Sequence, residues 1–198
     1  MKTPAIFMDR DGVLIKDIDL LTRCDQIQIL PGVPKALRLF SEAGFALVMV
    51  SNQTVVARGM ATEAEVDHVN KEMSALIVAA GGPQLEVFYI CPHHPKATLP
   101  RYRLDCSCRK PHPGLLLQAA QEHNLDLSSS FMIGDRVTDI IAGDKAGART
   151  ILLETGKHNA PAIETAAPID LSTQPTHHSA DLLSAAMWIL NGKTGSQS

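Results

Sequence analysis

Several features of secreted, membrane and nucleic-acid-binding proteins are scarce or missing in this sequence. Cysteine accounts for only four of 198 residues, so a disulfide framework is not expected in a reducing compartment. No apolar run reaches the roughly 20 residues of a membrane span, and the first run is too short for a secretory signal. Aromatic residues make up 4% and the net charge is -3, which argues against a basic surface for nucleic acid or anionic lipid. We therefore expect a cytoplasmic monomer that binds neither nucleic acid nor a membrane.

Hydrophobic residues make up 45% of the chain, which is enough for one well-buried domain. Short apolar runs alternate with stretches of helical periodicity, a pattern typical of an α/β fold. We expect a three-layer, Rossmann-like parallel sheet in a single domain over residues 1–191, followed by a disordered tail over residues 192–198. The predicted strands are Ala5–Met8, Phe45–Val50, Leu85–Ile90, Phe131–Ile133 and Thr150–Leu153. The predicted helices are Pro34–Ala43, Thr62–Ala80, Gly114–His123, Thr138–Ala146 and Ser179–Asn191.

Polar side chains follow three of these predicted strands. Asp9 and Asp11 come after the first strand, Ser51 after the second, and Asp135 after the fourth, with Asp139 four residues later. Because the carboxyl ends of parallel strands meet at one edge of a sheet, these side chains should converge. Four clustered carboxylates raise one another's pKa values, so a divalent cation and a nearby lysine or arginine are implied. Oxygen ligands with room for water favour Mg²⁺.

Each of these residues, taken alone, is more often a turn or helix-capping residue than a ligand. The Asp-Arg-Asp-Gly stretch at residues 9–12 also resembles the start of a calcium loop. That interpretation fails because Leu14 occupies the sixth loop position, where a glycine is needed. Four motifs occur in order along the chain, each at a predicted strand end or helix start: Asp-x-Asp-Gly, Ser-Asn, Lys-Pro and Gly-Asp-x-x-x-Asp. This order favours a single shared site over a set of unrelated turns.

A second cluster begins with Cys106 and Cys108, one residue apart and followed at once by Arg109 and Lys110. Such a stretch is open to four interpretations: a disulfide pair, a redox site, half of a metal site, or a basic patch for nucleic acid. The acidic net charge counts against the basic patch, and the sparse cysteines count against a disulfide pair.

Cys91 and His93 lie at the other end of the same proline-rich segment. With Cys106 and Cys108 they form a plausible tetrahedral Zn²⁺ set with no open position for water. His94 remains an alternative ligand, and the spacing differs from the common two-residue zinc knuckle. A zinc loop over residues 91–108 would order this segment and fix the two cations that follow it.

The four motifs resemble those of haloacid dehalogenase superfamily phosphatases: "DRDGV", "SNQ", "RKP" and "GDRVTD", over roughly residues 5–157. The pair "CPHHP" and "CSCRKPHPG" is similar to the zinc-loop branch that holds heptose bisphosphate phosphatases and histidinol-phosphate phosphatases. The resemblance implies Mg²⁺-dependent hydrolysis of a small phosphomonoester, with heptose 1,7-bisphosphate favoured. Histidinol phosphate or another sugar phosphate is the alternative substrate. The alternative from a different class is a zinc-stabilised binding module with an inert core.

The resemblance also implies a role for each residue. Asp9 would be the nucleophile and Asp11 the general acid and base. Among the other catalytic residues, Ser51 would hold a phosphoryl oxygen, Lys110 would stabilise the transferring phosphoryl group, and Asp139 would orient Lys110 or the water ligands of the metal. The implied Mg²⁺ ligands are Asp9, the backbone carbonyl of Asp11, and Asp135. The implied substrate contacts are Ser51, Asn52, Gln53, Thr54, Arg109, Lys110 and Arg136.

The intervals between the motifs leave no room for a cap domain. Only 39 residues separate Asp11 from Ser51, and 58 separate Ser51 from Lys110. Selectivity should therefore come from loops 17–21 and 52–58, together with Arg109. Two departures from the family bear on the substrate alone. The chain has Asp-Leu at 19–20 where the family usually has Gly-Tyr, and Thr-Val-Val at 54–56 where it usually has Ser-Gly-Ile.

Overall fold

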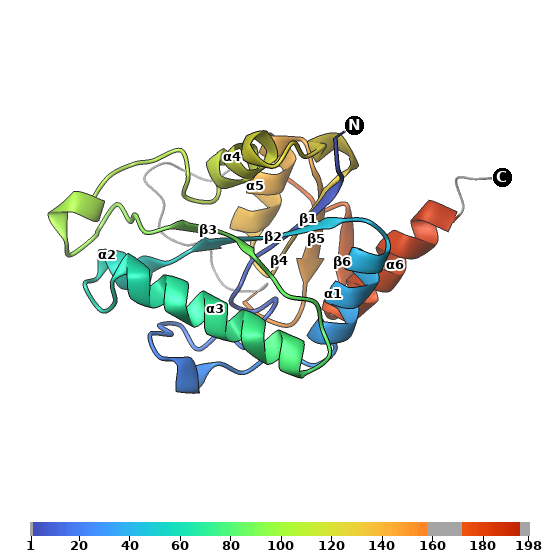
Figure 1. The fold of residues 1–198 in the computed structure, drawn as a ribbon. Helices are drawn as coiled ribbons and strands as arrows, with labels where there is room; N and C mark the ends of the chain where they lie inside the picture. The colour runs from blue at the N-terminus through green and yellow to red at the C-terminus, as the bar shows by residue number, and fades with distance from the viewer. Residues whose placement is uncertain (1, 158–171, 195–198) are drawn as a thin grey trace.

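Six parallel strands form one sheet in the computed structural model, which describes residues 2–157 and 172–194 (Figure 1). Their spatial order is β3-β2-β1-β4-β5-β6. All five predicted strands are confirmed, with bounds that shift by at most two residues. The strands are β1 (Ala5–Met8), β2 (Ala46–Asn52), β3 (Val87–Cys91), β4 (Phe131–Gly134), β5 (Arg149–Leu153) and β6 (His177–Ser179).

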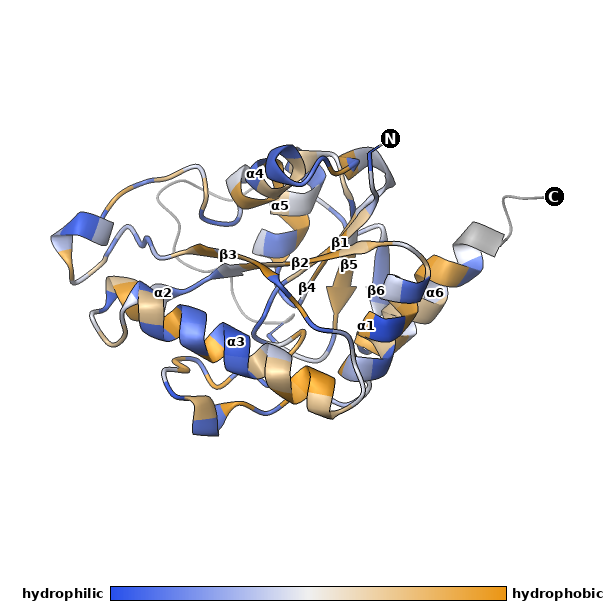
Figure 2. Cartoon of the chain, viewed as in Figure 1, coloured by the Kyte–Doolittle hydropathy of each residue, from blue (hydrophilic) through white to orange (hydrophobic). Residues whose placement is uncertain are grey.

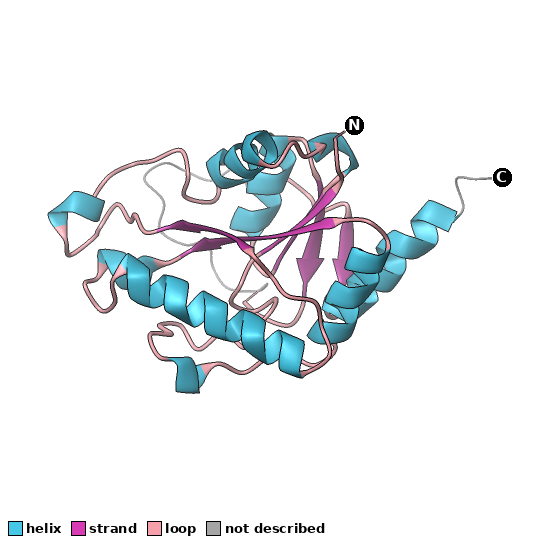
Figure 3. Cartoon of the chain, viewed as in Figure 1, coloured by secondary structure: helices cyan, strands magenta, loops and turns pink. Residues whose placement is uncertain are grey.

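Helices cover both faces of the sheet, as Figure 3 shows. Three 3₁₀ turns, at Cys24–Gln26, Pro100–Tyr102 and Leu127–Ser129, lie in the connecting loops. The helices are α1 (Val33–Glu42), α2 (Thr54–Ala57), α3 (Glu63–Ala79), α4 (Gly114–Glu122), α5 (Val137–Ala146) and α6 (Leu182–Thr194).

Strand β1 illustrates why the fold has three layers. Ile6 and Met8 belong to a buried cluster with residues of α1, α3 and α6, whereas Ala5 and Phe7 belong to a second cluster with residues of α4 and α5. Because successive side chains of a strand point to opposite faces, a wholly apolar strand needs cover on both sides. Figure 2 shows this concentration of hydrophobic residues in the strands at the centre of the molecule. The predicted three-layer α/β fold is confirmed.

The C-terminal region differs from the prediction. Residues His177–Ser179 pair in parallel with Ile151–Leu153 as β6, so Ser179 ends a strand rather than beginning a helix. Three residues are too few to show a periodicity, and pairing with β5 decides their conformation. Helix α6 also continues to Thr194, three residues into the tail predicted to be disordered. A Cβ added at Gly192 would meet no atom of the described residues within 4 Å. No close packing therefore requires glycine here, and its effect is the lower helix propensity of glycine. The remaining tail residues, 195–198, lie outside the described part.

The sheet order brings the ends of three strands together. Because β1 lies between β2 and β4, the residues that follow these strands share one edge of the sheet, where the strand order reverses. The backbone N–H of Asp9 donates to the carbonyl of Ile133 at 3.1 Å, which ties the end of β1 to β4. Among the described residues, no helix is long and apolar enough to cross a membrane.

Candidate active site

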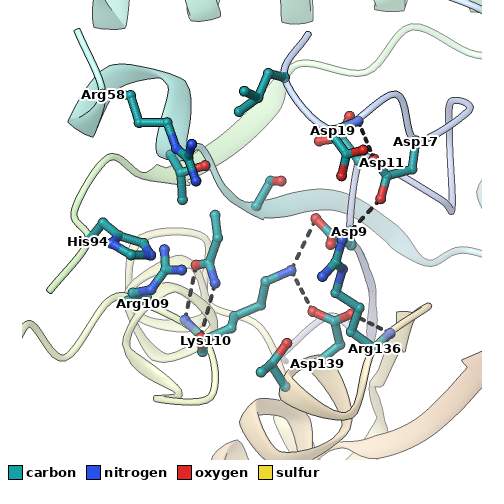
Figure 4. A pocket seen from close by; sticks show the side chains of 15 residues that line it. Asp9, Asp11, Asp17, Asp19, Arg58, His94, Arg109, Lys110, Arg136 and Asp139 are labelled. Carbon is teal, nitrogen blue, oxygen red and sulfur yellow. Dashed lines mark hydrogen bonds and ion pairs between the residues drawn. The ribbon is translucent and has the colours of Figure 1, made fainter. Parts of the chain in front are cut away.

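Three carboxylates converge at the carboxyl edge of the sheet. Asp9 follows β1, Asp135 follows β4 and Asp139 lies in the first turn of α5, and one oxygen of each lies within 4.8 Å of the others. All three side chains are buried. Lys110 reaches this cluster from the loop before α4: its Nζ lies 3.1 Å from Asp9 Oδ1 and 2.7 Å from Asp139 Oδ1 (Figure 4). It also donates to the carbonyl of Val50 at 2.8 Å.

Burial dominates the electrostatics of the cluster. It raises the pKa of Asp135 to about 7, and the negative charges of Asp139 and Asp9 add to this effect. It also raises the pKa of Asp139 to about 6, although the charge of Lys110 opposes this. Burial works against a charged Lys110, but the carboxylates of Asp139 and Asp9 still raise its pKa. One lysine therefore leaves the negative charge of three acids incompletely balanced.

Two glycines allow the backbone to approach these carboxylates. Gly12 has a φ of 82°, and an added Cβ would lie 2.5 Å from an oxygen of Asp135. At Gly134, an added Cβ would lie 2.2 Å from the Cβ of Asp139. A side chain at either position would displace a carboxylate, which explains the glycine in the Asp-x-Asp-Gly and Gly-Asp motifs.

Asp11 lies outside this group of three carboxylates. Its oxygens accept hydrogen bonds from the guanidinium of Arg10, at 3.0 to 3.2 Å, and from Gln53 Nε2 at 3.1 Å. Burial raises the pKa of Asp11, while the positive charge of Arg10 opposes the rise. The same amide of Gln53 donates to Ser51 Oγ at 2.9 Å. Arg10 and its buried partner Asn70 on α3 were not anticipated from the sequence.

Asn52 fixes the backbone of Lys110. Its Nδ2 donates to the Lys110 carbonyl at 3.0 Å, and its Oδ1 accepts from the Lys110 N–H at 3.1 Å. The preceding residue, Arg109, donates from Nη1 to the carbonyl of His93 at 3.0 Å. Burial lowers the pKa of Arg109, and its buried Nε has no hydrogen-bond partner among the described residues. The chain thus presents Arg109 and Lys110 from one rigid segment.

The four predicted metal-binding residues meet beside this segment. One donor atom each from Cys91, His93, Cys106 and Cys108 lies within 4.8 Å of the others. The three pairs of sulfur atoms lie 3.1 to 3.5 Å apart, too far for a disulfide bond of about 2.05 Å. Hydrogen bonding with Cys91, and less strongly with Cys106 and His93, lowers the pKa of Cys108 to about 5. His94 is not part of this group.

A cavity of about 420 Å³ opens over the cluster. Six of the seven predicted substrate contacts line it. The exception is Gln53, which is 3% exposed because its amide is engaged with Arg10, Asp11 and Ser51. The lining residues are Asp9, Asp11, Asp17, Asp19, Leu20, Ser51, Asn52, Thr54, Arg58, His94, Arg109, Lys110, Arg136, Thr138 and Asp139.

The charges of the cavity are divided between two sides. Figure 4 shows Arg58, His94 and Arg109 on one side of Lys110, with Asp9, Asp11, Asp17 and Asp19 on the other. Arg136 forms an ion pair with Asp17 at 3.1 Å. Burial works to raise the pKa of Asp17, but a hydrogen bond from the backbone N–H of Asp19, with contacts to Lys157 and Arg136, lowers it. Loops 17–21 and 52–58 were predicted to surround the site, but the sequence did not single out Arg58 or His94 as lining residues.

Comparison with known proteins places this geometry in a family. The HAD-hydrolase-like family model matches residues 107–185. Over 165 residues the chain is 40% identical to D-glycero-beta-D-manno-heptose-1,7-bisphosphate 7-phosphatase from Escherichia coli K12, which covers 83% of this chain and 86% of that protein. The chain belongs to the heptose bisphosphate phosphatase family. The protein of the same name from Yersinia pestis is 43% identical over 155 residues, covering 78% of this chain and 82% of that protein.

A solved structure agrees with this assignment. The crystal structure of D,D-heptose 1,7-bisphosphate phosphatase from B. bronchiseptica, complexed with magnesium and phosphate, matches with a TM-score of 0.78 and 28% identity. The match covers 97% of this chain and 99% of that one. The haloacid dehalogenase-type fold and the phosphatase family predicted from the motifs are confirmed.

The local backbone accommodates both departures from the family pattern. Asp19, where the family resemblance led us to expect glycine, adopts a φ of 69°, in a region that aspartate tolerates better than most residues. Thr54 begins the short helix α2, and Val55 within it has no positive φ. Val55 is buried against α3 and the loop over residues 91–108, in a small apolar cluster with Val66 and Ala97. A valine therefore fits here without strain.

Proposed function

We propose that this protein is a Mg²⁺-dependent phosphatase that removes the 7-phosphate of D-glycero-beta-D-manno-heptose 1,7-bisphosphate. The observation that carries the proposal is the buried Asp9–Lys110–Asp139 arrangement at the floor of a cavity with three arginines in its walls. The names of the relatives support the choice of sugar and of the 7-phosphate.

The donor set fits Mg²⁺. Asp135 Oδ1 is buried and has no hydrogen-bond partner within residues 2–157 and 172–194, while Oδ2 accepts from the N–H of Lys157 at 2.7 Å. An orphaned carboxylate oxygen beside Asp9 is what a hard divalent cation requires. Since the Asp11 side chain is held by Arg10, Asp11 would contribute its backbone carbonyl. When bound, Mg²⁺ supplies positive charge that neutralises phosphoryl oxygens.

Asp9 is the nucleophile in this proposal. Its Oδ1 accepts from the N–H of Arg10 at 2.7 Å and pairs with Lys110, which leaves Oδ2 to attack phosphorus. The product of the first step is an aspartyl phosphate, and water hydrolyses it in the second step. Lys110, held in place by Asp139, carries the positive charge that stabilises the transferring group in both steps.

Asp11 and Ser51 complete the chemistry. The raised pKa of Asp11 suits a group that protonates the departing sugar oxygen and later accepts a proton from water. Because Gln53 donates to Ser51 Oγ, the hydroxyl hydrogen of Ser51 is available for a phosphoryl oxygen. Asn52 acts on the substrate indirectly, through the backbone of Lys110.

The cationic side of the cavity is the proposed place for the second phosphate. Arg109 is buried, and no part of the chain that the structure describes pairs with its Nε. An anion would satisfy this donor. Arg58 and His94 line the same side. Histidinol phosphate instead carries a cationic amine at its remote end, which this side would repel. This argument favours the bisphosphate over the alternative substrate.

We expect Arg109→Ala to lower kcat/KM for heptose 1,7-bisphosphate about 100-fold, because it deletes a bidentate phosphate contact. Hydrolysis of p-nitrophenyl phosphate should fall less than about 3-fold, since Lys110 still serves the reacting phosphate. Arg101→Ala, which removes an exposed arginine of the same segment outside the cavity, is the matched control. Equal losses on both substrates, or a wild-type preference for histidinol phosphate, would contradict the substrate assignment.

The cysteine and histidine group is proposed to hold one structural Zn²⁺. Its four ligands match a closed tetrahedral site with no position for water. It fixes His93, whose carbonyl accepts from Arg109, and Cys108, which precedes Arg109 in the chain. Zinc would therefore set the position of both cations without touching the substrate.

We expect Cys108→Ser to lower zinc content below one per chain and phosphatase activity roughly tenfold, because the segment bearing Lys110 loosens. Zinc is measured by mass spectrometry, and loosening by amide exchange over residues 91–108. Cys24→Ser is the control, because Cys24 lies outside the metal-binding group. Wild-type protein without bound metal, whose thiols all titrate freely, would refute the zinc site.

A further inference from the structure

Arg10 is the largest fully buried side chain of the described residues. It occupies the middle position of the Asp-x-Asp motif, and its guanidinium contacts three separate segments. Nε and Nη2 donate to the carboxylate of Asp11, Nη2 also donates to Gln53 Oε1 at 2.9 Å, and Nη1 donates to Asn70 Oδ1 at 3.2 Å. Since a buried guanidinium is costly to desolvate, so complete a set of acceptors indicates a fixed position.

Asn70 anchors this arrangement from outside the catalytic loops. It lies in the middle of α3 and is 1% exposed. Asparagine is a poor helix former, and its amide is costly to bury. Its neighbours on the buried side of α3, Val69 and Met73, belong to the apolar core. Packing does not explain a polar residue here, whereas its hydrogen bond with Arg10 does.

Asp11 is the group that the arrangement restrains. Both of its oxygens accept from Arg10, and one also accepts from Gln53. Its side chain is nevertheless 25% exposed and lines the cavity. A carboxylate with free χ rotation would sample several orientations, most of them directed away from a bound substrate. The two-pronged hydrogen bonding of the Arg10 guanidinium restricts the Asp11 carboxylate to one of these orientations.

We propose that Arg10 and Asn70 are positioning residues that hold the Asp11 carboxylate at the cavity wall, aimed at the leaving oxygen. The inference rests on the proposed function, in which Asp11 protonates that oxygen. Asn70 acts through Arg10, and Arg10 acts through Asp11. The expected effect therefore falls on the proton transfer rather than on phosphate binding.

The leaving group distinguishes this role from a general loss of structure. A sugar alkoxide needs a proton to depart, whereas p-nitrophenolate leaves without one. A misplaced Asp11 should therefore slow the first step for the sugar phosphate and spare it for the aryl phosphate. Single-turnover measurement with enzyme in excess isolates that first step from the later hydrolysis of the aspartyl phosphate.

The test compares Asn70→Ala with Ser74→Ala, which removes another buried polar side chain from α3. Ser74 bonds to the backbone of Leu85, away from the cavity. For Asn70→Ala we expect kcat on heptose 1,7-bisphosphate to fall about tenfold with KM within about twofold. Single-turnover release of p-nitrophenol should stay within about twofold of wild type. Asn70→Asp, which keeps an oxygen acceptor for Arg10, should restore most of the activity.

Equal losses of Asn70→Ala on the two substrates, no loss on either, or the same pattern in Ser74→Ala would overturn the positioning role. If Asn70→Ala does not fold, Arg10→Lys is tested instead. It keeps the buried positive charge but removes the guanidinium that donates to both oxygens of Asp11. The same split between leaving groups is then expected, and its absence overturns the role. A wild-type protein that releases phosphate from neither substrate would instead overturn the proposed function, and the positioning role with it.

Discussion

The variant Asp9→Asn is expected to lose phosphate release almost completely, with kcat lower by about 10⁴-fold or more. An amide oxygen is too weak a nucleophile to attack phosphorus, so no aspartyl phosphate forms. The shape of the side chain hardly changes, and the amide oxygen can still accept from the N–H of Arg10. Lys110 keeps Asp139 at 2.7 Å and the Val50 carbonyl at 2.8 Å. We therefore expect the fold to survive and Mg²⁺ binding to be largely retained.

Three measurements check this expectation. Phosphate release gives the loss of turnover, thermal unfolding gives the state of the fold, and intact-protein mass spectrometry after acid quench detects a phosphorylated aspartate in wild type alone. Asp25→Asn serves as the matched control, because the Asp25 side chain is 61% exposed and lies outside the cavity. Turnover by Asp9→Asn close to that of wild type would rule out an aspartyl phosphate on this residue.

The sequence predicts the parts of the site that follow from strand order. Asp9 and Asp135 directly follow β1 and β4. Ser51 was predicted to follow the second strand but lies near the end of β2, which extends two residues beyond the predicted Val50. Because these three strands are neighbours, the convergence of the side chains needs only the parallel-sheet rule. Lys110 was predicted through its motif and the cysteines beside it. The structure shows its ion pairs with Asp9 and Asp139, and it brings the three cysteines and His93 together. Periodicity and strand order together account for this much.

The contacts made by side chains from distant segments could not be predicted in this way. Arg10 occupies a position that the Asp-x-Asp motif leaves undefined, and its burial depends on Asn70, which is 60 residues away. Gln53 turns inward because Arg10 offers it a donor. From the sequence His94 was considered only as an alternative metal ligand, whereas it lines the cavity. Each of these outcomes depends on which residue supplies the hydrogen-bond partner. Because that residue is distant in the sequence, the local sequence pattern does not predict the contact.

The second large effect is expected for Asp135→Asn. This substitution should lower the activity but raise the stability of the metal-free protein. Asp135→Asn deletes the orphaned oxygen that suits Mg²⁺, so kcat/KM should fall on the order of 10³-fold. For the same reason, added Mg²⁺ should raise the Tm of wild type and leave that of the variant unchanged. Asp144→Asn, an exposed change on α5, is the control.

Without metal, Asp135→Asn should stabilise the protein at pH 8, in contrast to its harmful effect on activity. The pKa of Asp135 is raised from 3.8 to about 7 by burial and by the charges of Asp139 and Asp9. A carboxyl with a folded-state pKa above its unfolded value contributes stability that is complete below about pH 4 and lost as pH rises through about 7. At pH 8 without metal, Asp135→Asn should therefore unfold at a higher temperature than wild type, and near pH 4 the two should converge. The amide keeps an oxygen for the N–H of Lys157. A variant less stable than metal-free wild type at pH 8 would mean that the ionised carboxylate of Asp135 is not a source of strain in the empty site.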